Sequence, residues 1–541
     1  MKKLCFLLTA CFIVLVMGTA FAGGGRQGGG GAAAGPVSLR INDLTRNYES
    51  TMWYAKLQKD LNVKVEALSL EVEQLNLAIA SGDLPDITIL PPNSMSLIAS
   101  IIQADAALDL SPYLETKLPN LLRPAYAPIN KLMQELMGGP NHKLYFTTYG
   151  MAADNPEGGI LPTRGFIVRW DYYKDIGAPA INNDDDYLAA LKAMQAKYPL
   201  SRSGRKTYAI GVEKNFGDMG GYRAATTLGN VALNVWAFAG TRYATDVYTG
   251  QPVNGYTDVN RSMYWADMRF YNKVYRAGLF DPDSFSMSFD EYKAKIADGV
   301  YMGLYYLQEE LYEKEAALDP QTKAKYVPVP STGAYAFANK IAAFGRFPQF
   351  GKLIPKNTKN QEKALEVLNW LYDPDNSRVM YLGDKGVYWD YNAGGKPYIL
   401  EKTLEMMVST PMLPGLDTRD QHQVTWSDTA LHPDGSYYNL IHEKEYKSRG
   451  LNPALQDFCN FYQVSYPAEA QYNLFKQGKV KDNSNDYGQN ITSFILMPTD
   501  IKRVSDGVVQ IFERAMPRLI QANSDAEFLQ IQNQVLADAR A

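Results

Sequence analysis

The sequence predicts an α/β fold built on a parallel sheet, and three observations lead to that prediction. Segments with strand-like alternation and segments with helical periodicity follow one another as β-α-β-α-β between residues 37 and 90. A glycine and a proline separate the second of these helices from the third strand. The chain has 541 residues, which is enough for two or more domains of ordinary size.

The elements follow in order along the chain. Residues 37–41 alternate between apolar and polar side chains and predict a first strand, and residues 53–61 predict a helix. Residues 63–67 alternate again as a second strand. Residues 71–80 place apolar side chains three and four residues apart and predict a second helix, and 87–90 is the third strand. Successive parallel strands linked by helices form a sheet whose ligands bind outside its carboxyl edge.

Polar residues separate the second helix from the third strand. Gly82 is expected to end the helix, because glycine adopts the left-handed conformation without a steric penalty. Pro85 cannot lie inside a helix, so the chain must turn before the strand begins. For Asp83 a local structural role is favoured over contact with a ligand. On spacing alone, this pattern fits any helix-to-strand connection.

Residues 1–22 have the features of a secretory signal peptide. Lys2 and Lys3 precede an apolar stretch at 4–17, and Ala-Phe-Ala at 20–22 is a small-residue cleavage motif. The apolar stretch is shorter than the about 20 residues that a membrane span needs. The sequence therefore predicts export.

The glycine- and alanine-rich residues 23–36 predict a flexible tether after the signal peptide. An alternative interpretation takes residues 8–11 as a lipobox, which would place a lipid on Cys11. A periplasmic protein is the favoured prediction, and a membrane-anchored lipoprotein is the alternative. In either case, the protein is expected to be peripheral to the membrane at most.

Composition excludes several classes of protein. Cys459 is the only cysteine after the signal peptide, so an intramolecular disulfide is not predicted. The formal net charge of -4 provides no broad basic field, and nucleic acid is not an expected partner. The 37 tyrosines supply many aromatic faces that can pack in a core or stack on sugar rings.

No metal site or cofactor is predicted. The acidic run at 182–186 lacks the ligand spacing of a calcium loop, and an asparagine cap followed by acids in a first helical turn explains it. The four histidines lack the spacing of zinc ligands. The sequence also lacks a glycine-flanked serine elbow, a His-Glu-x-x-His helix and a phosphate loop.

Several further motifs occur in a fixed order after the third strand. Their segments are 108–114, 143–145, 164–171, 176–179, 271–282, 351–364 and 368–374. Together with residues 78–89, they resemble the extracellular solute-binding proteins of ABC importers. The glycine-rich residues 383–389 and the long C-terminal tail are similar to a large lipoprotein-like subgroup that is named for aldouronate or other oligosaccharides. The chain has Gly23 where such relatives carry a lipidated cysteine, which favours a free periplasmic protein.

The resemblance implies a periplasmic binding protein-like fold of type II, with two α/β lobes, a hinge and a cleft between the lobes. It places lobe one at 37–160 plus 340–385, and lobe two at 164–335 plus 386–541. It also implies a binding protein without enzyme activity, expected to be a monomer. This protein would capture a carbohydrate, an oligosaccharide above all, and deliver it to the permease subunits of an ABC transporter.

Eight residues are candidate ligand contacts, and each also has a structural explanation. Aromatic faces can support the C–H face of a pyranose, but an aromatic residue in an apolar run usually belongs to a core. Polar and charged side chains can bind hydroxyl or carboxylate groups, but they also form turns and surface ion pairs. The candidates are Trp236, Tyr149, Trp389, Trp170 and Phe347 among the aromatic residues, with Asn93, Asp390 and Arg169 among the polar ones.

Alternative functions remain open at this point. A peptide-binding importer component would share the predicted lobes. A secreted glycoside hydrolase would require two carboxylates about 5 to 10 Å apart. An adhesin or scaffold would show internal repeats or long β runs, and neither is evident in the sequence.

Overall fold

The computed structural model divides the chain into two compact units, Met1–Pro36 and Val37–Ala541. Every helix and strand described below lies in the second unit. The structure describes residues 35–42, 51–91, 95–124, 126–148, 165–214, 235–236, 243–246, 252–305, 325–333, 351–409, 426, 430–480 and 499–541.

The first sheet has four strands in the order β10-β3-β1-β2. Its strands β1 (Val37–Asn42), β2 (Val63–Leu68) and β3 (Ile87–Ile89) run parallel. The fourth strand, β10 (Lys352–Leu353), comes from much later in the chain and pairs antiparallel with β3. The predicted β-α-β-α-β order is confirmed, whereas the pairing with β10 has no local sequence signal.

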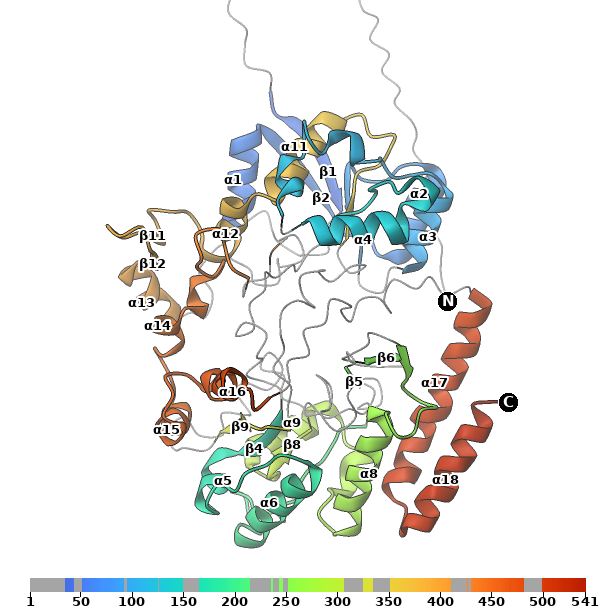
Figure 1. Ribbon diagram of the computed structural model, residues 1–541, viewed down its shortest axis with the longest axis vertical. Coiled ribbons are helices and arrows are strands. Elements are labelled where there is room, and N and C mark those ends of the chain that lie inside the picture. Colours follow the sequence, from blue (N-terminus) through green and yellow to red (C-terminus); the bar gives the residue numbers. More distant parts are fainter. Residues whose placement is uncertain are drawn as a thin grey trace, which may run out of the picture. The chain divides into compact units, whose positions relative to one another are not determined.

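Helices surround the first sheet (Figure 1). Their apolar faces join the strands in one hydrophobic cluster, to which Leu75 and Ile79 contribute from the predicted face of α2. The helices that contribute to this cluster are α1 (Met52–Leu61), α2 (Val72–Ser81), α3 (Met95–Gln103), α4 (Ala127–Met137), α11 (Gln361–Leu371) and α12 (Pro374–Leu382).

The turn between α2 and β3 has the predicted geometry. Gly82 caps α2 in the left-handed conformation, with φ of 70°, and its N–H donates to the carbonyls of Ala78 and Ile79. Asp83 forms an ion pair with Arg40, with an N–O distance of 2.7 Å. The partner of Asp83 is thus a side chain of β1, and the local structural role stays a prediction.

The second hydrophobic cluster is built around a three-stranded antiparallel sheet of order β8-β4-β9. These strands are β4 (Phe166–Arg169), β8 (Gly303–Leu304) and β9 (Tyr326–Val329). Helices α8, α17 and α18 lie side by side in this part of the chain (Figure 1). The helices that contribute to the cluster are α5 (Trp170–Asp175), α6 (Asp184–Lys197), α8 (Met263–Arg276), α9 (Phe289–Asp298), α15 (Pro453–Tyr462), α16 (Pro467–Lys476), α17 (Thr499–Ile520) and α18 (Asp525–Asp538).

Two smaller groups of elements complete the described chain. A three-stranded sheet contains β5 (Val235–Trp236), β6 (Tyr243–Asp246) and β7 (Pro252–Asn254). The hairpin β11 (Trp389–Tyr391) and β12 (Pro397–Ile399) precedes α13 (Glu401–Ser409), and α14 (Lys444–Lys447) follows later. A small cluster joins Leu382, Trp389, Ile399 and Leu440.

The segment after residue 386 contributes to both large clusters. Trp426, Ala430 and Tyr438 pack in the first cluster, whereas residues from Ala454 onward pack in the second. The predicted lobe two included all of residues 386–541.

Helix caps account for the acidic motifs considered in the sequence. The Asn183 side chain accepts a hydrogen bond of 2.9 Å from the Asp186 N–H at the start of α6, which confirms the predicted cap. Asp373 caps α12 in the same way. Across the described ranges, none of the helices is long and apolar enough to cross a membrane.

Candidate functional site

The carboxyl edge of the first sheet brings distant parts of the chain together. Because β1 and β3 are parallel, with Asn42 opposite Thr88, both strands end at the same edge. The start of β10 also lies there, since Lys352 pairs with Ile89. In open α/β sheets, ligands bind outside the carboxyl ends of the strands. This edge is therefore the candidate ligand site.

A further segment reaches the same edge. Thr147 and Lys352 exchange two backbone hydrogen bonds, both of 2.9 Å. The Tyr372 hydroxyl donates to the Thr148 carbonyl at 2.6 Å and fixes the segment against the end of α11. Five connections thus begin or end at this edge: those after Asn42, after β2, after β3, after Thr148, and before β10.

Asn42 joins the ends of β1 and β3 to the segment after β2, and sequence reasoning missed it. Its side chain is fully buried; its amide N–H donates to the Ile89 carbonyl at 2.9 Å, and its amide oxygen accepts from the Leu70 N–H at 2.7 Å. A buried amide with both functions satisfied holds the ends of three strands in place. The available signal was that Asn42 extends the alternating strand 37–41 by one polar residue that is buried.

Three predicted ligand contacts lie outside the described residues but close to this edge in sequence. Asn93 follows the described residue 91, Tyr149 follows Thr148, and Phe347 precedes residue 351 by four positions. Their chain neighbours belong to the connections that meet at the edge. All three stay predictions.

Trp236 is described only through its backbone. It belongs to β5 and pairs with Thr245 of β6. Its side chain lies outside the described part of the structure, so its role as an aromatic platform also stays a prediction.

The register of the second sheet locates Arg169. Phe166 pairs with Val329, and Arg169 pairs with Tyr326 at the other end of the same strands. The chain enters β4 at Phe166 and leaves β9 at Val329, so Arg169 lies at the end away from both connections. Its guanidinium is buried and donates to the Asp171 carboxylate at 2.9 and 3.0 Å. These contacts favour the alternative of a strand arginine paired with a neighbouring carboxylate.

Trp170 follows Arg169 and is fully buried. Its indole N–H donates to the Asp457 carboxylate at 3.0 Å, and its ring packs against Phe458 with 5.0 Å between centroids. The Lys174 ammonium binds the same carboxylate at 2.8 Å. Trp170 thus joins α5 to α15, which is the packing role named as its alternative.

Trp389 and Asp390 lie in the hairpin that starts at β11. Trp389 is 3% exposed, and its indole N–H donates to the Gly383 carbonyl at 2.9 Å. The guanidinium of Arg378 lies 5.1 Å from the centre of its ring. Asp390 is partly exposed, and its carboxylate accepts from the Tyr391 N–H at 2.8 Å. An edge of Trp389 lines a hollow of about 710 Å³ between α1, α12 and β11.

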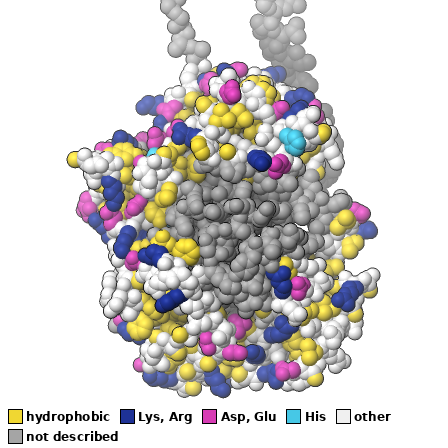
Figure 2. All heavy atoms as spheres, viewed as in Figure 1, with side chains coloured by type: hydrophobic (Ala, Val, Ile, Leu, Met, Phe, Trp, Pro, Cys, Tyr) yellow, Lys and Arg dark blue, Asp and Glu magenta, His cyan; other side chains and the backbone are white. Residues whose placement is uncertain are grey.

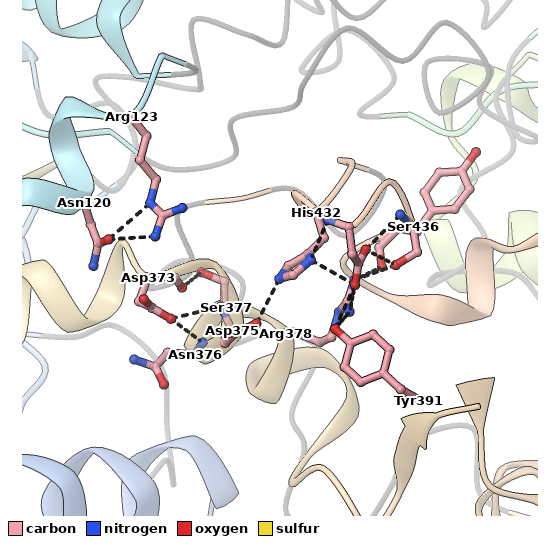
Figure 3. Close-up of polar contacts among 12 residues, drawn as sticks. Asn120, Arg123, Asp373, Asp375, Asn376, Ser377, Arg378, Tyr391, His432 and Ser436 are labelled. Carbon is pink, nitrogen blue, oxygen red and sulfur yellow. Dashed lines mark hydrogen bonds and ion pairs between the residues drawn. The ribbon is translucent and has the colours of Figure 1, made fainter. Parts of the chain in front are cut away.

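A buried ion pair lies beside this hairpin and was not predicted (Figure 3). Arg378 of α12 is 0% exposed and donates to Asp434 at 2.6 Å and to the Ser436 hydroxyl at 2.6 Å. The Tyr391 hydroxyl donates to the same carboxylate at 2.9 Å. The pair joins α12 to the segment around residue 434, and no local sequence pattern indicates it.

This ion pair controls the protonation of its neighbours. Burial alone would raise the pKa of Asp434, but hydrogen bonds from Arg378 and Ser436 outweigh it and hold that pKa well below its usual range. Burial and the nearby Asp434 raise the pKa of Tyr391 to about 12. Burial and the Arg378 charge lower the pKa of His432, so its imidazole is neutral at pH 7. The Asp434 carboxylate thus keeps its charge beside Arg378, and the ion pair ties α12 to the segment around residue 434.

Charged side chains of both signs are interspersed on the face seen in Figure 2. That distribution agrees with the small net charge of -4. Within the described ranges, no group of three or more His, Cys, Asp or Glu side chains could hold a metal ion.

Known proteins share the sequence features and the fold of this chain. The sequence model of bacterial extracellular solute-binding proteins matches residues 43–378. Lipoprotein LipO of Bacillus subtilis (strain 168) is 23% identical over 321 residues, which span 58% of this chain and 58% of the length of LipO.

Two solved structures of similar fold come from transport systems. An HMO-binding solute-binding protein associated with an ABC transporter of Bifidobacterium longum infantis has a TM-score of 0.58 at 15% identity, covering 94% of this chain and 97% of its own. The ABC-transporter substrate-binding protein FusA of S. pneumoniae, solved with kestose, has a TM-score of 0.54 at 15% identity, covering 93% and 96%. The predicted fold class, two α/β lobes of the type II periplasmic binding protein kind, is confirmed. Since the sequence model matches more than half of its length, the chain belongs to the family of bacterial extracellular solute-binding proteins.

Proposed function

We propose that the protein captures an oligosaccharide at the carboxyl edge of the first sheet and delivers it to the permease of an ABC importer. The observation that carries this proposal is the meeting of five connections at that edge, of which Asn42 holds three and the bridge between Thr147 and Lys352 holds the other two. Ligand bound between two lobes stabilises their closed form, and a permease can recognise that form. No catalytic step is part of the proposal.

Carbohydrate is the ligand class with the most support. Two solved relatives are described with carbohydrates: one is HMO-binding, and the other was solved with kestose. Hydroxyl-rich ligands need aromatic faces and amide or hydroxyl partners. Asn93, Tyr149 and Phe347 have such side chains and are close in sequence to described segments that end or begin at the sheet edge. Trp236 would supply a further face. The packing of Arg169, Trp170 and Trp389 gives them less support as contacts.

We also propose which residues form each lobe and where the protein is located in the cell. Lobe one contains the first cluster, and the packing of Trp426 and Tyr438 supports extending it to the segment 426–438. Lobe two contains the second cluster, including α15 to α18. We propose export by the signal peptide at 1–22, followed by residence in the periplasm as a monomer.

A ligand panel tests this function. The chain starting at residue 23 would be incubated with neutral oligosaccharides, acidic oligosaccharides and peptides, with thermal unfolding and product analysis as readouts. A ligand at 100 times its Kd should stabilise the protein by about 2.7 kcal/mol without any product. Stabilisation by peptides alone would contradict the ligand class, and hydrolysis of a sugar would contradict the absence of catalysis.

Variants test the site. Tyr149→Ala and Trp236→Ala should each weaken oligosaccharide binding by about 1 to 3 kcal/mol, roughly 5- to 150-fold in Kd. Tyr398→Ala is a matched control, because Tyr398 is an exposed tyrosine on β12 and no ligand role is assigned to it. Unchanged affinity in both site variants would refute the site assignment.

A further inference from the structure

A second hollow lies in the part of the chain that forms the second cluster. Its volume is about 500 Å³, within the range of about 300 to 1,000 Å³ that small-molecule sites occupy. It is lined by Lys206, Tyr208, Tyr275, Arg276, Phe280 and Asn523, among others. Nothing in the proposed transport function uses these residues.

Three chain segments form the walls of this hollow, and backbone contacts fix them. The chain turns at Gly278, where φ is 70°, immediately after the end of α8. Phe280 then pairs with Ile210 in a parallel bridge, which places it beside the segment that carries Tyr208. The Asn272 amide donates to the carbonyls of residues 519, 520 and 522 at 3.2, 3.0 and 2.6 Å. These bonds hold the turn between α17 and α18, with Asn523, against α8 (Figure 1).

The hollow is separate from the end of the second sheet at which the chain enters and leaves. Tyr208 pairs in parallel with Tyr301, just before β8, whereas Leu304 at the end of β8 pairs with Ile167 near the start of β4. Tyr208 is therefore at the end of the sheet where Arg169 lies, away from the connections at Phe166 and Val329.

The charges around the hollow favour an anion. Two cations, Lys206 and Arg276, line it, and its lining contains no acidic side chain. The nearest acids in sequence, Asp281 and Asp283, are both bound by Lys295 at 2.8 Å. Arg276 pairs through one terminal nitrogen with Asp525, a carboxylate that is 87% exposed. A guanidinium has five N–H donors, so a single pair leaves donors that a ligand can use.

The uncharged part of the lining consists mainly of rings. Tyr208 and Tyr275 are half-buried and supply most of the exposed ring surface, because Phe280 is only 4% exposed. The Lys206 ammonium lies 5.0 Å from the centre of the Tyr208 ring. Aromatic faces pack well on planar rings and on the C–H face of a pyranose. A guanidinium and an ammonium bind a carboxylate through charge-assisted hydrogen bonds.

We propose that this hollow binds a small carboxylate carried on a six-membered ring, with Lys206 and Arg276 holding the carboxylate and the aromatic side chains packing on the ring. Such a ligand could be a sugar acid or an aromatic acid, which share this chemistry. The site lies within one lobe and does not require the carbohydrate site to be occupied.

Ligand-observed NMR on the chain starting at residue 23 tests this proposal with glucuronate, glucose and benzoate as probes. Glucuronate, benzoate or both should bind, and glucose should not compete for the site. Lys206→Gln and Arg276→Gln should each weaken binding of the acid about tenfold or more. Lys192→Gln is the matched control, since Lys192 is exposed on α6 and does not line the hollow.

The outcomes distinguish a sugar acid from an aromatic acid, and they distinguish this hollow from the carbohydrate site. Binding of glucuronate alone supports a sugar acid, and binding of benzoate alone supports an aromatic acid. The absence of binding by either acid at 10 mM, roughly the weak end of measurable affinity, overturns the proposal. Equal binding in the wild type, Lys206→Gln and Arg276→Gln also overturns it. Binding of neutral oligosaccharide should be unchanged in both variants, so a failure here leaves the transport proposal intact.

Discussion

Replacing Asp434 with asparagine should strongly destabilise the part of the protein that contains α12. The Arg378 guanidinium is 0% exposed, and its main partner is this carboxylate, at 2.6 Å. Removing the charge leaves a buried cation without its counterion, and breaking such a pair costs about 3 to 5 kcal/mol. Because Asp434 is 19% exposed, water can replace part of the interaction, and we expect about 3 kcal/mol.

Thermal unfolding at pH 7, followed by circular dichroism and calorimetry, measures this loss. For a cooperative unit of about 150 to 250 residues, each kcal/mol shifts the midpoint by about 2 to 4 °C, so the expected decrease is about 6 to 12 °C. Glu135→Gln is the matched control, since its ion pair with Lys131 is exposed and 3.8 Å long, and it should shift the midpoint by about 1 to 2 °C at most. A shift for Asp434→Asn no larger than that of the control would refute the argument.

The same pair predicts a pH dependence. The pKa of Asp434 is lower in the folded protein than in the unfolded chain, where it is about 3.9. The stability that the ionised Asp434 carboxylate contributes is therefore complete above the unfolded pKa of about 3.9, and it is lost as the pH falls through the folded pKa. The difference in stability between wild type and Asp434→Asn should be constant from about pH 5 to 8 and should narrow below about pH 4. A difference that grows in acid would contradict the assigned direction.

Two further substitutions test the first sheet. Asn42→Ala removes the bonds to the Ile89 carbonyl and the Leu70 N–H and leaves both groups unsatisfied. Denaturant unfolding should show a loss of about 3 kcal/mol, and oligosaccharide binding should weaken. Unchanged stability would show that the amide is dispensable. Gly82→Ala should cost about 1 kcal/mol, because φ is 70° while the added Cβ would lie an acceptable 3.4 Å from Asn357. Gly82→Asn should cost less, since asparagine tolerates this conformation, and an equal loss would point to a steric cause instead.

Local patterns in the sequence were sufficient for the first part of the fold. Alternation and helical spacing placed β1, α1, β2, α2 and β3 correctly, because each of these elements is decided by residues within about ten positions. The same holds for the caps at Gly82 and Asn183, whose partners are three or four residues away.

Contacts between distant segments could not be predicted in this way. The pairing of Lys352 with Ile89 and the ion pair of Arg378 with Asp434 depend on residues that only the folded chain brings together. The aromatic candidates show the same difficulty. An indole ring such as that of Trp170 or Trp389 can pack on a sugar. The indole N–H groups of these two residues, however, donate to the Asp457 carboxylate and the Gly383 carbonyl inside the protein. Asn42 was missed because the alternation of apolar and polar residues in a strand does not indicate the role of a polar residue at its end.

The late arrival of β10 has a consequence for the biogenesis of the protein. Until residue 352 has been synthesised, β3 has no partner on one side, and its backbone N–H and C=O groups form an open sheet edge. An open edge can pair with another chain, so a nascent or truncated protein that ends before this point carries a risk of aggregation. The pairing spans more than 260 residues, and contacts of such separation form slowly. The first sheet is therefore completed only after about two thirds of the chain has been synthesised.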